Sequence, residues 1–168
     1  EHPTKAEMCL TCAPQLIELA KRSSAAELFF LLGRGADAYV SLEAALKLKE
    51  IAYIATQECP AGEMKHGPLA LITEGVFAVF GATDGPMRDK VVSNMKEVQA
   101  RGGFVVGLTT DEDTIIEKVA DATVKLPQAG QVYLSALLSI IPLQLLAYHI
   151  ARINGCEIDQ PRNLAKSV

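Results

Sequence analysis

Short apolar segments alternate along this chain with longer segments in which apolar residues recur at helical spacing. Four runs of five or six residues, at 27–32, 76–80, 104–108 and 122–126, are rich in Leu, Val, Phe and Ala. Such runs are typical of strands that are buried on both faces of a parallel sheet. A shorter segment, 55–58, is a further candidate strand.

Five other segments have the helical pattern. Pro14 is a flaw in the first of them. Pro142 lies inside the last, where we predict a break or a kink because proline removes a backbone hydrogen bond. The predicted helices cover residues 6–22, 42–54, 86–100, 114–120 and 132–153.

This alternation predicts an α/β fold, a three-layer α/β/α sandwich with a five-stranded parallel sheet. A length of 168 residues suits a single domain. Ligands of such folds bind beyond the C-terminal ends of the strands, so we expect the turns at 33–37, 59–68 and 81–85 at the ligand-binding edge. The first turn, Gly33-Arg34-Gly35, lacks the G-x-G-x-x-G pattern, so we predict no dinucleotide site.

The predicted helix at 42–54 carries charges in an unusual place. On a helical wheel Glu43, Lys47 and Glu50 share one narrow stripe, and apolar residues cover most of the remaining circumference. A helix that is apolar nearly all round is usually buried, and unpaired buried charge is very unfavourable. The stripe is therefore a candidate catalytic group, and an ordinary surface ion pair between Glu43 and Lys47 is the alternative.

The segment at 62–68 brings further polar groups close together. Its two glycines and its proline predict a loop without regular structure, and the loop carries Glu63, Lys65 and His66. Histidine has a pKa near neutrality, so His66 is a candidate general acid or base. A solvated loop residue is the alternative interpretation.

Composition excludes several classes of protein. The net charge is −4 and Trp is absent, which argues against nucleic-acid binding. No apolar run reaches the roughly 20 residues of a membrane span, and no signal pattern precedes the first helix. The chain starts at Glu1 rather than Met, so we interpret it as a fragment or a processed form.

The four cysteines do not indicate a metal site. Cys9 and Cys12 form a C-x-x-C pair, but no second pair or histidine cluster has the spacing of metal ligands. We predict reduced thiols, no metal and no cofactor, which fits a cytoplasmic protein.

Two stretches resemble a known family. LEAALKLKE followed by AGEMKHGPLALI, and the C-terminal DQPRNLAKSV, are similar to the isomerase half of glutamine–fructose-6-phosphate aminotransferase (glucosamine-6-phosphate synthase). The resemblance runs from about residue 29 to the end. It implies a sugar-isomerase (SIS) domain, a flavodoxin-like fold with five parallel strands between helices.

The resemblance also implies catalytic roles. Glu50 would be the base that moves a proton between C2 and C1 of fructose 6-phosphate, and Lys47 would assist at the oxygen. His66 would open the sugar ring in the site of a neighbouring subunit, which implies a homo-oligomer. Lys166 would form the Schiff base, and the product would be glucosamine 6-phosphate.

We also expect residues that bind the substrate without reacting. Glu43 is a candidate that orients a lysine, and Gly33, Arg34 and Gly35 are candidates at the strand edge. The 81–85 turn lacks the Ser cluster of a phosphate loop and contains Asp84, whose charge would repel phosphate.

The resemblance leaves domains unaccounted for. The family's glutaminase domain and first SIS domain are absent from this sequence. We therefore interpret residues 1–168 as one SIS domain, the second isomerase subdomain, with residues 156–168 as a catalytic tail and with poor activity alone. The alternatives are a non-catalytic sugar-phosphate-binding SIS module, a stand-alone phosphosugar isomerase and a deglycase.

Overall fold

The computed structural model describes residues 2–83 and 85–162. It contains one five-stranded sheet in the order β2-β1-β3-β4-β5, and every neighbouring pair is parallel. This confirms the predicted α/β fold with its parallel sheet. The strands are β1 (Leu28–Gly33), β2 (Ala55–Pro60), β3 (Phe77–Gly81), β4 (Phe104–Thr110) and β5 (Ala122–Leu126).

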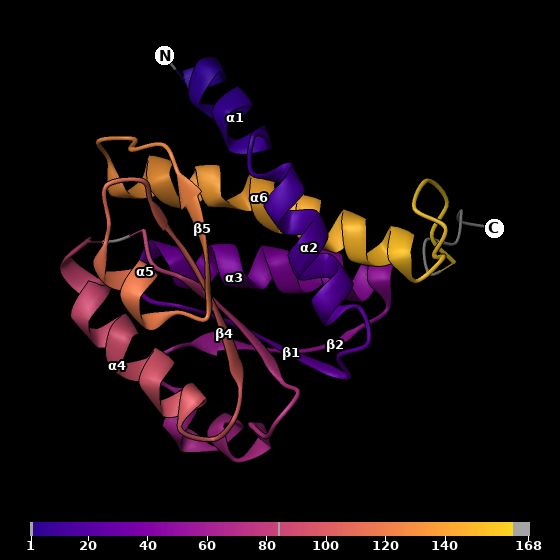
Figure 1. Cartoon of the computed structure of the whole chain (residues 1–168), viewed down its shortest axis with the longest axis horizontal. Coiled ribbons are helices and arrows are strands. Elements are labelled where there is room, and N and C mark those ends of the chain that lie inside the picture. Colours follow the sequence, from indigo (N-terminus) through magenta and orange to yellow (C-terminus); the bar gives the residue numbers. More distant parts are fainter. Residues whose placement is uncertain (1, 84, 163–168) are drawn as a thin grey trace.

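Helices cover both faces of the sheet (Figure 1). The first group, α2, α3 and α6, lies on one face, and α4 and α5 lie on the other. The α-helices are α1 (His2–Leu10), α2 (Ala13–Ser23), α3 (Ala36–Lys47), α4 (Arg88–Gln99), α5 (Ile115–Val119) and α6 (Val132–Ile153).

The side chains of strand β1 explain why helices pack on both faces of the sheet. Side chains of a strand point alternately to opposite faces of the sheet. Phe29 and Leu31 are buried in the core against α2, α3 and α6, while Phe30 and Leu32 are buried in the core against α4 and α5. A strand that is apolar at every position is thereby buried on both sides.

The predicted helix at 6–22 is two helices, α1 and α2. Pro14 lies in the first turn of α2, and Cys12 is its N-cap. A proline ring clashes with the carbonyl four residues earlier, here that of Leu10, where α1 ends. Pro14 therefore ends the first helix at Leu10, one turn before the proline itself.

Helix α6 continues through Pro142, so the predicted break is wrong. Pro142 is buried, and α6 packs against α1, α2 and α3, which stabilises the helix despite the missing N–H group. By length and composition α6 could span a membrane, but 56% of its most apolar stretch is buried inside the domain. Such burial is typical of a core helix.

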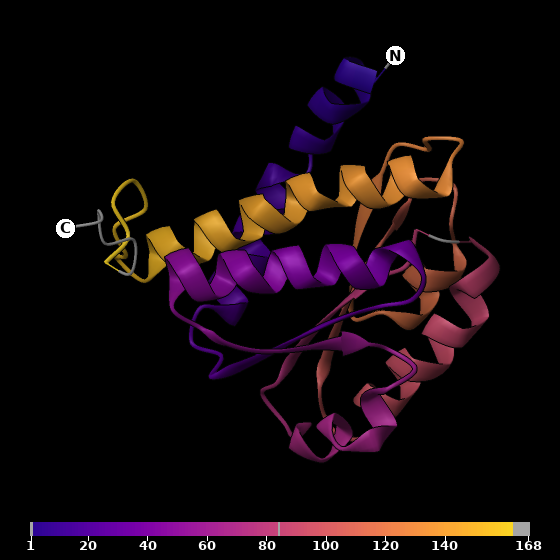
Figure 2. The same ribbon diagram turned by 180° about the vertical axis from the view of Figure 1, so that it is seen from behind.

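The helix predicted at 42–54 starts earlier and changes form. It begins as α3 at Ala36 and continues as a π-helix, η1 (Leu48–Ala52), which ends at Tyr53 in the left-handed conformation with φ 56°. The prediction that it is buried nearly all round is wrong, because Leu42 and Leu46 are 49% and 42% exposed. Helix α6 lies along one side of α3 and strands β1 and β2 lie along another, which leaves the rest of its circumference uncovered by the described residues (Figure 2).

The turns that follow β1, β2 and β3 meet at one edge of the sheet, as predicted, because these strands are parallel. The segment after β2 contains two short 3₁₀ turns, Met64–His66 and Pro68–Leu71, so the expectation of no regular structure there is wrong. Met64 is fully buried in the core under α4, which fixes the first of these turns.

Candidate active site

The stripe predicted on α3 exists as a chain of ion pairs. Lys47 Nζ lies 3.1 Å from Glu50 Oε2 and 3.6 Å from Glu43 Oε1. The three side chains are half-buried, with 29% of Lys47, 39% of Glu43 and 31% of Glu50 exposed. The ordinary ion pair of Glu43 with Lys47 is thus part of a three-member group.

The carboxylates keep Lys47 in its charged form. The hydrogen bond to Glu50 raises the pKa of Lys47, burial opposes this, and the charges of Glu43 and Glu50 raise the pKa further. Lys47 is therefore a cationic hydrogen-bond donor and a poor nucleophile at neutral pH. It can stabilise negative charge on an oxygen but is unsuited to forming a Schiff base.

The π-helix η1 places Glu50 in its middle. π-Helical turns inside α-helices are rare and occur frequently at functional sites. Glu50 follows Lys47 by three residues, and the turn keeps their side chains within hydrogen-bond distance. Sequence periodicity missed this turn because an α-helical wheel already brings the two residues close.

The C-terminal tail begins beside this group. The Arg162 backbone N–H donates to Tyr53 Oη at 3.0 Å, and the Arg162 guanidinium lies 4.0 Å from the centre of the Tyr53 ring. Figures 1 and 2 both show the segment that follows α6, up to residue 162, beside the η1 end of α3. The described part of the tail thus contacts Tyr53, three residues after Glu50, while Lys166 is outside the described residues and its role stays a prediction.

His66 lies at the other end of strand β2. Glu50 precedes β2, whereas His66 follows it on the 3₁₀ turn Met64–His66. A strand of six residues spans about 20 Å, so the two side chains of one chain are far apart. The His66 side chain is 73% exposed, and its Nε2 lies 3.8 Å from Glu63 Oε2.

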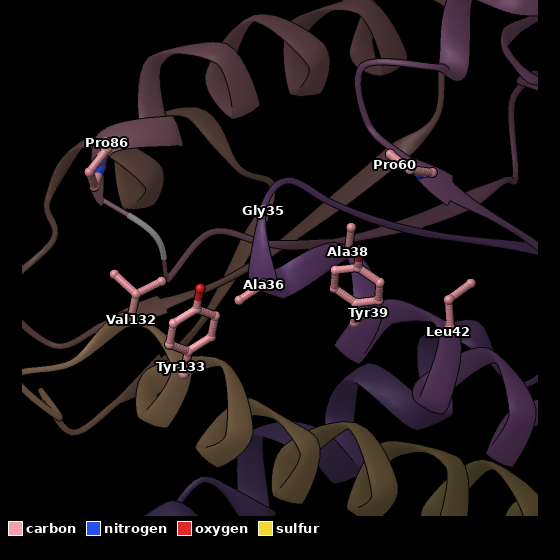
Figure 3. A pocket seen from close by; sticks show the side chains of 9 residues that line it. All are labelled: Gly35, Ala36, Ala38, Tyr39, Leu42, Pro60, Pro86, Val132 and Tyr133. Atoms are coloured by element: carbon pink, nitrogen blue, oxygen red, sulfur yellow. The ribbon is translucent and has the colours of Figure 1, made fainter.

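A cavity of about 750 Å³ lies at the C-terminal edge of the sheet, between the start of α3 and the start of α6 (Figure 3). Its walls are mainly apolar, and the predicted site contributes only Gly35 to them. Glu43, Lys47 and Glu50 do not line it. The residues that line it are Gly35, Ala36, Ala38, Tyr39, Leu42, Pro60, Pro86, Val132 and Tyr133.

Gly33 and Arg34 are engaged within the protein. The Gly33 carbonyl accepts a hydrogen bond from the Ala61 N–H at 2.7 Å. A side-chain carbon at Gly33 would lie 2.5 Å from the Asp37 backbone carbon, so the close approach of α3 requires glycine there. Arg34 Nε donates to Asn94 Oδ1 at 3.1 Å. Whether either residue contacts substrate stays a prediction.

Asp37 is a polar residue of this edge that sequence reasoning missed. It is 1% exposed, and its carboxylate accepts hydrogen bonds from Thr83 N at 2.8 Å and Thr83 Oγ1 at 2.7 Å. It lies in the first turn of α3, where a helix favours negative charge. The available signal was an acidic residue directly after the Gly33–Gly35 turn.

All four cysteines are free thiols. Burial raises the pKa of Cys9, Cys12 and Cys59. Cys12 Sγ lies 2.8 Å from the carbonyl oxygen of Cys9, to which it donates. Within residues 2–83 and 85–162, no three His, Cys, Asp or Glu side chains form a group that could hold a metal ion.

Residues 16–153 match the model of the SIS domain family. The chain belongs to this family. It is 48% identical over 166 residues to a glutamine–fructose-6-phosphate aminotransferase [isomerizing] from Bacteroides thetaiotaomicron, covering 99% of this SIS chain and 27% of that protein. The chain thus spans about a quarter of the length of the curated relatives that it matches.

Solved structures agree with this assignment. The SIS chain matches the C-terminal domain of glucosamine-fructose-6-phosphate aminotransferase from Francisella tularensis with a TM-score of 0.88 and 36% identity, over 95% of this chain and 45% of that one. It also matches the sugar isomerase domain of an RpiR transcription factor from Sphaerobacter thermophilus, with a TM-score of 0.68 over 92% of this chain and 93% of that one. At 18% identity the second likeness shows the fold alone.

Proposed function

We propose that this SIS domain is the isomerase subdomain of an enzyme that forms glucosamine 6-phosphate from fructose 6-phosphate and glutamine-derived ammonia. The observation that carries the proposal is the half-buried group of Glu43, Lys47 and Glu50 beside the C-terminal tail, in a chain 48% identical to a named aminotransferase. The other domains of that activity would lie in the remainder of a longer protein, which we place in the cytoplasm.

The group has the components of aldose–ketose isomerisation. Glu50 acts as the base that moves a proton between C2 and C1 of the open-chain sugar. Lys47, held protonated between two carboxylates, stabilises the negative charge that develops on the substrate oxygen. Glu43 orients Lys47 through their 3.6 Å ion pair. Lys166 on the tail supplies the amine for a Schiff base at C2.

His66 serves the site of a second copy of the chain. Strand β2, about 20 Å long, separates the turn that carries His66 from the segment that carries Glu50 of the same chain, so His66 acts on the sugar ring of another site. Its 73% exposure leaves the imidazole available to a neighbouring protomer. The proposal therefore includes a homo-oligomer in which each site combines Glu50 of one protomer with His66 of another.

The sugar phosphate is held outside this subdomain. The start of a helix is a favourable place for a phosphate group, because its N–H groups point outward. In α3 this place already has the buried carboxylate of Asp37 in its first turn. Asp37 adds to the two reasons that the sequence gives, the missing Ser cluster of the 81–85 turn and the charge of Asp84, for expecting poor phosphate binding at this edge. Asp84 itself lies outside the described residues.

A non-catalytic sugar-phosphate-binding module is the second candidate, since the same fold also occurs as the sugar isomerase domain of a transcription factor. Such a module does not need a lysine that is paired with two carboxylates, as Lys47 is with Glu43 and Glu50. A stand-alone phosphosugar isomerase or a deglycase shares the acid–base chemistry, but the resemblance of the terminal ten residues favours the aminotransferase.

The test is Glu50→Gln in the full-length protein. The amide keeps the shape of the side chain and loses the base, so we expect kcat to fall by about 10²-fold or more while sugar binding is retained. Glu58→Gln is the matched control, because Glu58 is a partly buried glutamate of β2 that forms an ion pair with Lys49. The proposal fails if Glu50→Gln turns over at the rate of the control.

A further inference from the structure

Arg34 lies at one end of a polar network that no role in substrate chemistry explains. It follows β1 and reaches across to α4, where Nε donates to Asn94 Oδ1 at 3.1 Å. Asn94 is 3% exposed, and its Nδ2 donates to Glu97 Oε2 at 3.3 Å. Glu97 Oε1 lies 2.8 Å from Lys65 Nζ. The network thus starts at β1 and ends at the residue next to His66.

The same guanidinium covers the backbone of the segment that carries His66. A side-chain carbon added at Gly62 would lie 3.1 Å from Arg34 Nη1 and 3.3 Å from Cζ. The absence of a side chain at Gly62 lets the flat guanidinium lie directly against this segment. Arg34 therefore fixes residues 61–66 from one side, while Met64 anchors them in the core from the other.

His66 needs such support because its own side chain has little. Its imidazole is 73% exposed, and the carboxylate that lies near it among the described residues, that of Glu63, is 65% exposed and 3.8 Å away. A catalytic group must be held within a fraction of an ångström of its productive position. The position of the imidazole is thus set by the backbone of residues 61–66, and hence by what holds that backbone.

We propose that Arg34 is a positioning residue, which holds the Gly62–His66 segment against Asn94 of α4 so that His66 stands at a fixed place for a neighbouring protomer. This rests on the proposed function, in which His66 acts in a second copy. It gives Arg34 a role different from the direct substrate contact that the sequence predicts.

The experiment is a double-mutant cycle in the full-length protein with fructose 6-phosphate and glutamine. Arg34→Met keeps the length of the side chain and loses its donors, and we expect kcat to fall about 10-fold or more with little change in KM, as a small misplacement does. In a His66→Asn background the same substitution should change kcat by less than about 2-fold, since the group it positions is gone. Arg152→Met is the matched control, because Arg152 is an exposed arginine of α6 that donates to Tyr148 Oη, away from this network.

The activity of mixed oligomers distinguishes the positioning of His66 from a general structural role of Arg34. Mixing Arg34→Met with Glu50→Gln protomers should restore activity, because intact His66 segments then meet intact Glu50 sites. Mixing Arg34→Met with His66→Asn should not. If Arg34→Met does not fold, Lys65→Met tests the same network, because Lys65 forms an exposed ion pair with Glu97. We expect kcat of this variant to fall about 3-fold.

An equal loss from Arg34→Met in both backgrounds, or none in either, refutes the positioning role and leaves the proposed function standing. If His66→Asn alone leaves kcat unchanged, the role of His66 fails and this inference fails with it. The experiment therefore separates failure of the Arg34 role from failure of the His66 role in the proposed function.

Discussion

Replacement of Asp37 by alanine removes a buried acceptor that joins α3 to the turn after β3. The carboxylate of Asp37 accepts from both the backbone N–H and the hydroxyl of Thr83, and Thr83 is itself buried. A carbon on Gly81 would lie only 2.7 Å from Asp37 Cβ, so the two segments are in close contact. Few atoms can move into the space that the carboxylate leaves.

The expected loss of stability follows from the two donors that Thr83 supplies among the described residues. A buried donor without a partner costs about 1–3 kcal/mol, so two of them cost about 2–6 kcal/mol. We expect about 3 kcal/mol for Asp37→Ala, because water can enter the vacated space and pair with one donor. Thr83→Val removes only the hydroxyl and its hydrogen bond, so it should cost about 1–2 kcal/mol. Single domains are stable by about 5–15 kcal/mol, so both variants should still fold.

The assay is urea unfolding of the 168-residue chain, read as a change in midpoint at constant slope. The double variant Asp37→Ala/Thr83→Val should lose less than the sum of the two single variants, by about 1 kcal/mol or more. Ser93→Ala, an exposed position on α4, is the control and should stay within about 0.5 kcal/mol of the parent. Losses at Asp37 and Thr83 that simply add, or a loss below about 1 kcal/mol for Asp37→Ala, would refute the reasoning.

Further expectations concern thiols, assembly and the isolated chain. Burial raises the pKa of Cys9, Cys12 and Cys59, so their alkylation should be slow at pH 7.5 and should accelerate as the pH rises above the ordinary thiol pKa; fast labelling at neutral pH would contradict this. Sedimentation of the full-length protein at micromolar concentration should show a homo-oligomer, and a clean monomer would count against a shared His66. Borohydride treatment of the isolated 168-residue chain with millimolar fructose 6-phosphate should give little adduct at Lys166, because phosphate binding normally positions the reacting carbons. Stoichiometric adduct would show that this subdomain binds its substrate unaided.

Hydrophobic pattern sufficed to predict β1, β3, β4 and β5, whereas the edge strand β2 has the partly exposed sequence ATQECP and lacks this pattern. The segment at 122–126 is a strand with the same limits, and the others differ at their ends by one or two residues. Strands such as β1 are apolar at every position because both faces are covered, which makes their pattern unmistakable. The helix predictions were less accurate where tertiary packing determines whether a helix continues. Pro142 is tolerated because α6 is held along its length by neighbouring helices, which no local pattern reveals.

The candidate site was predictable in part for the same reason. Glu43, Lys47 and Glu50 are neighbours on one helix, so spacing alone brought them together. The separation of His66 from Glu50 depends on which end of β2 each occupies, and the network of Arg34, Asn94 and Glu97 joins segments about 60 residues apart in sequence. Such long-range contacts leave no periodic signal in a single sequence.

The most direct test of the central claim separates Schiff-base formation from proton transfer in the full-length protein. Glu50→Gln and the parent are mixed with fructose 6-phosphate, and borohydride-trapped adduct at Lys166 is measured by mass spectrometry beside the rate of glucosamine 6-phosphate formation. If Glu50 is the base, the variant forms the adduct as the parent does and makes product about 10²-fold or more slowly. Product at the parent's rate, or loss of the adduct together with the product, would contradict the role of Glu50 in proton transfer.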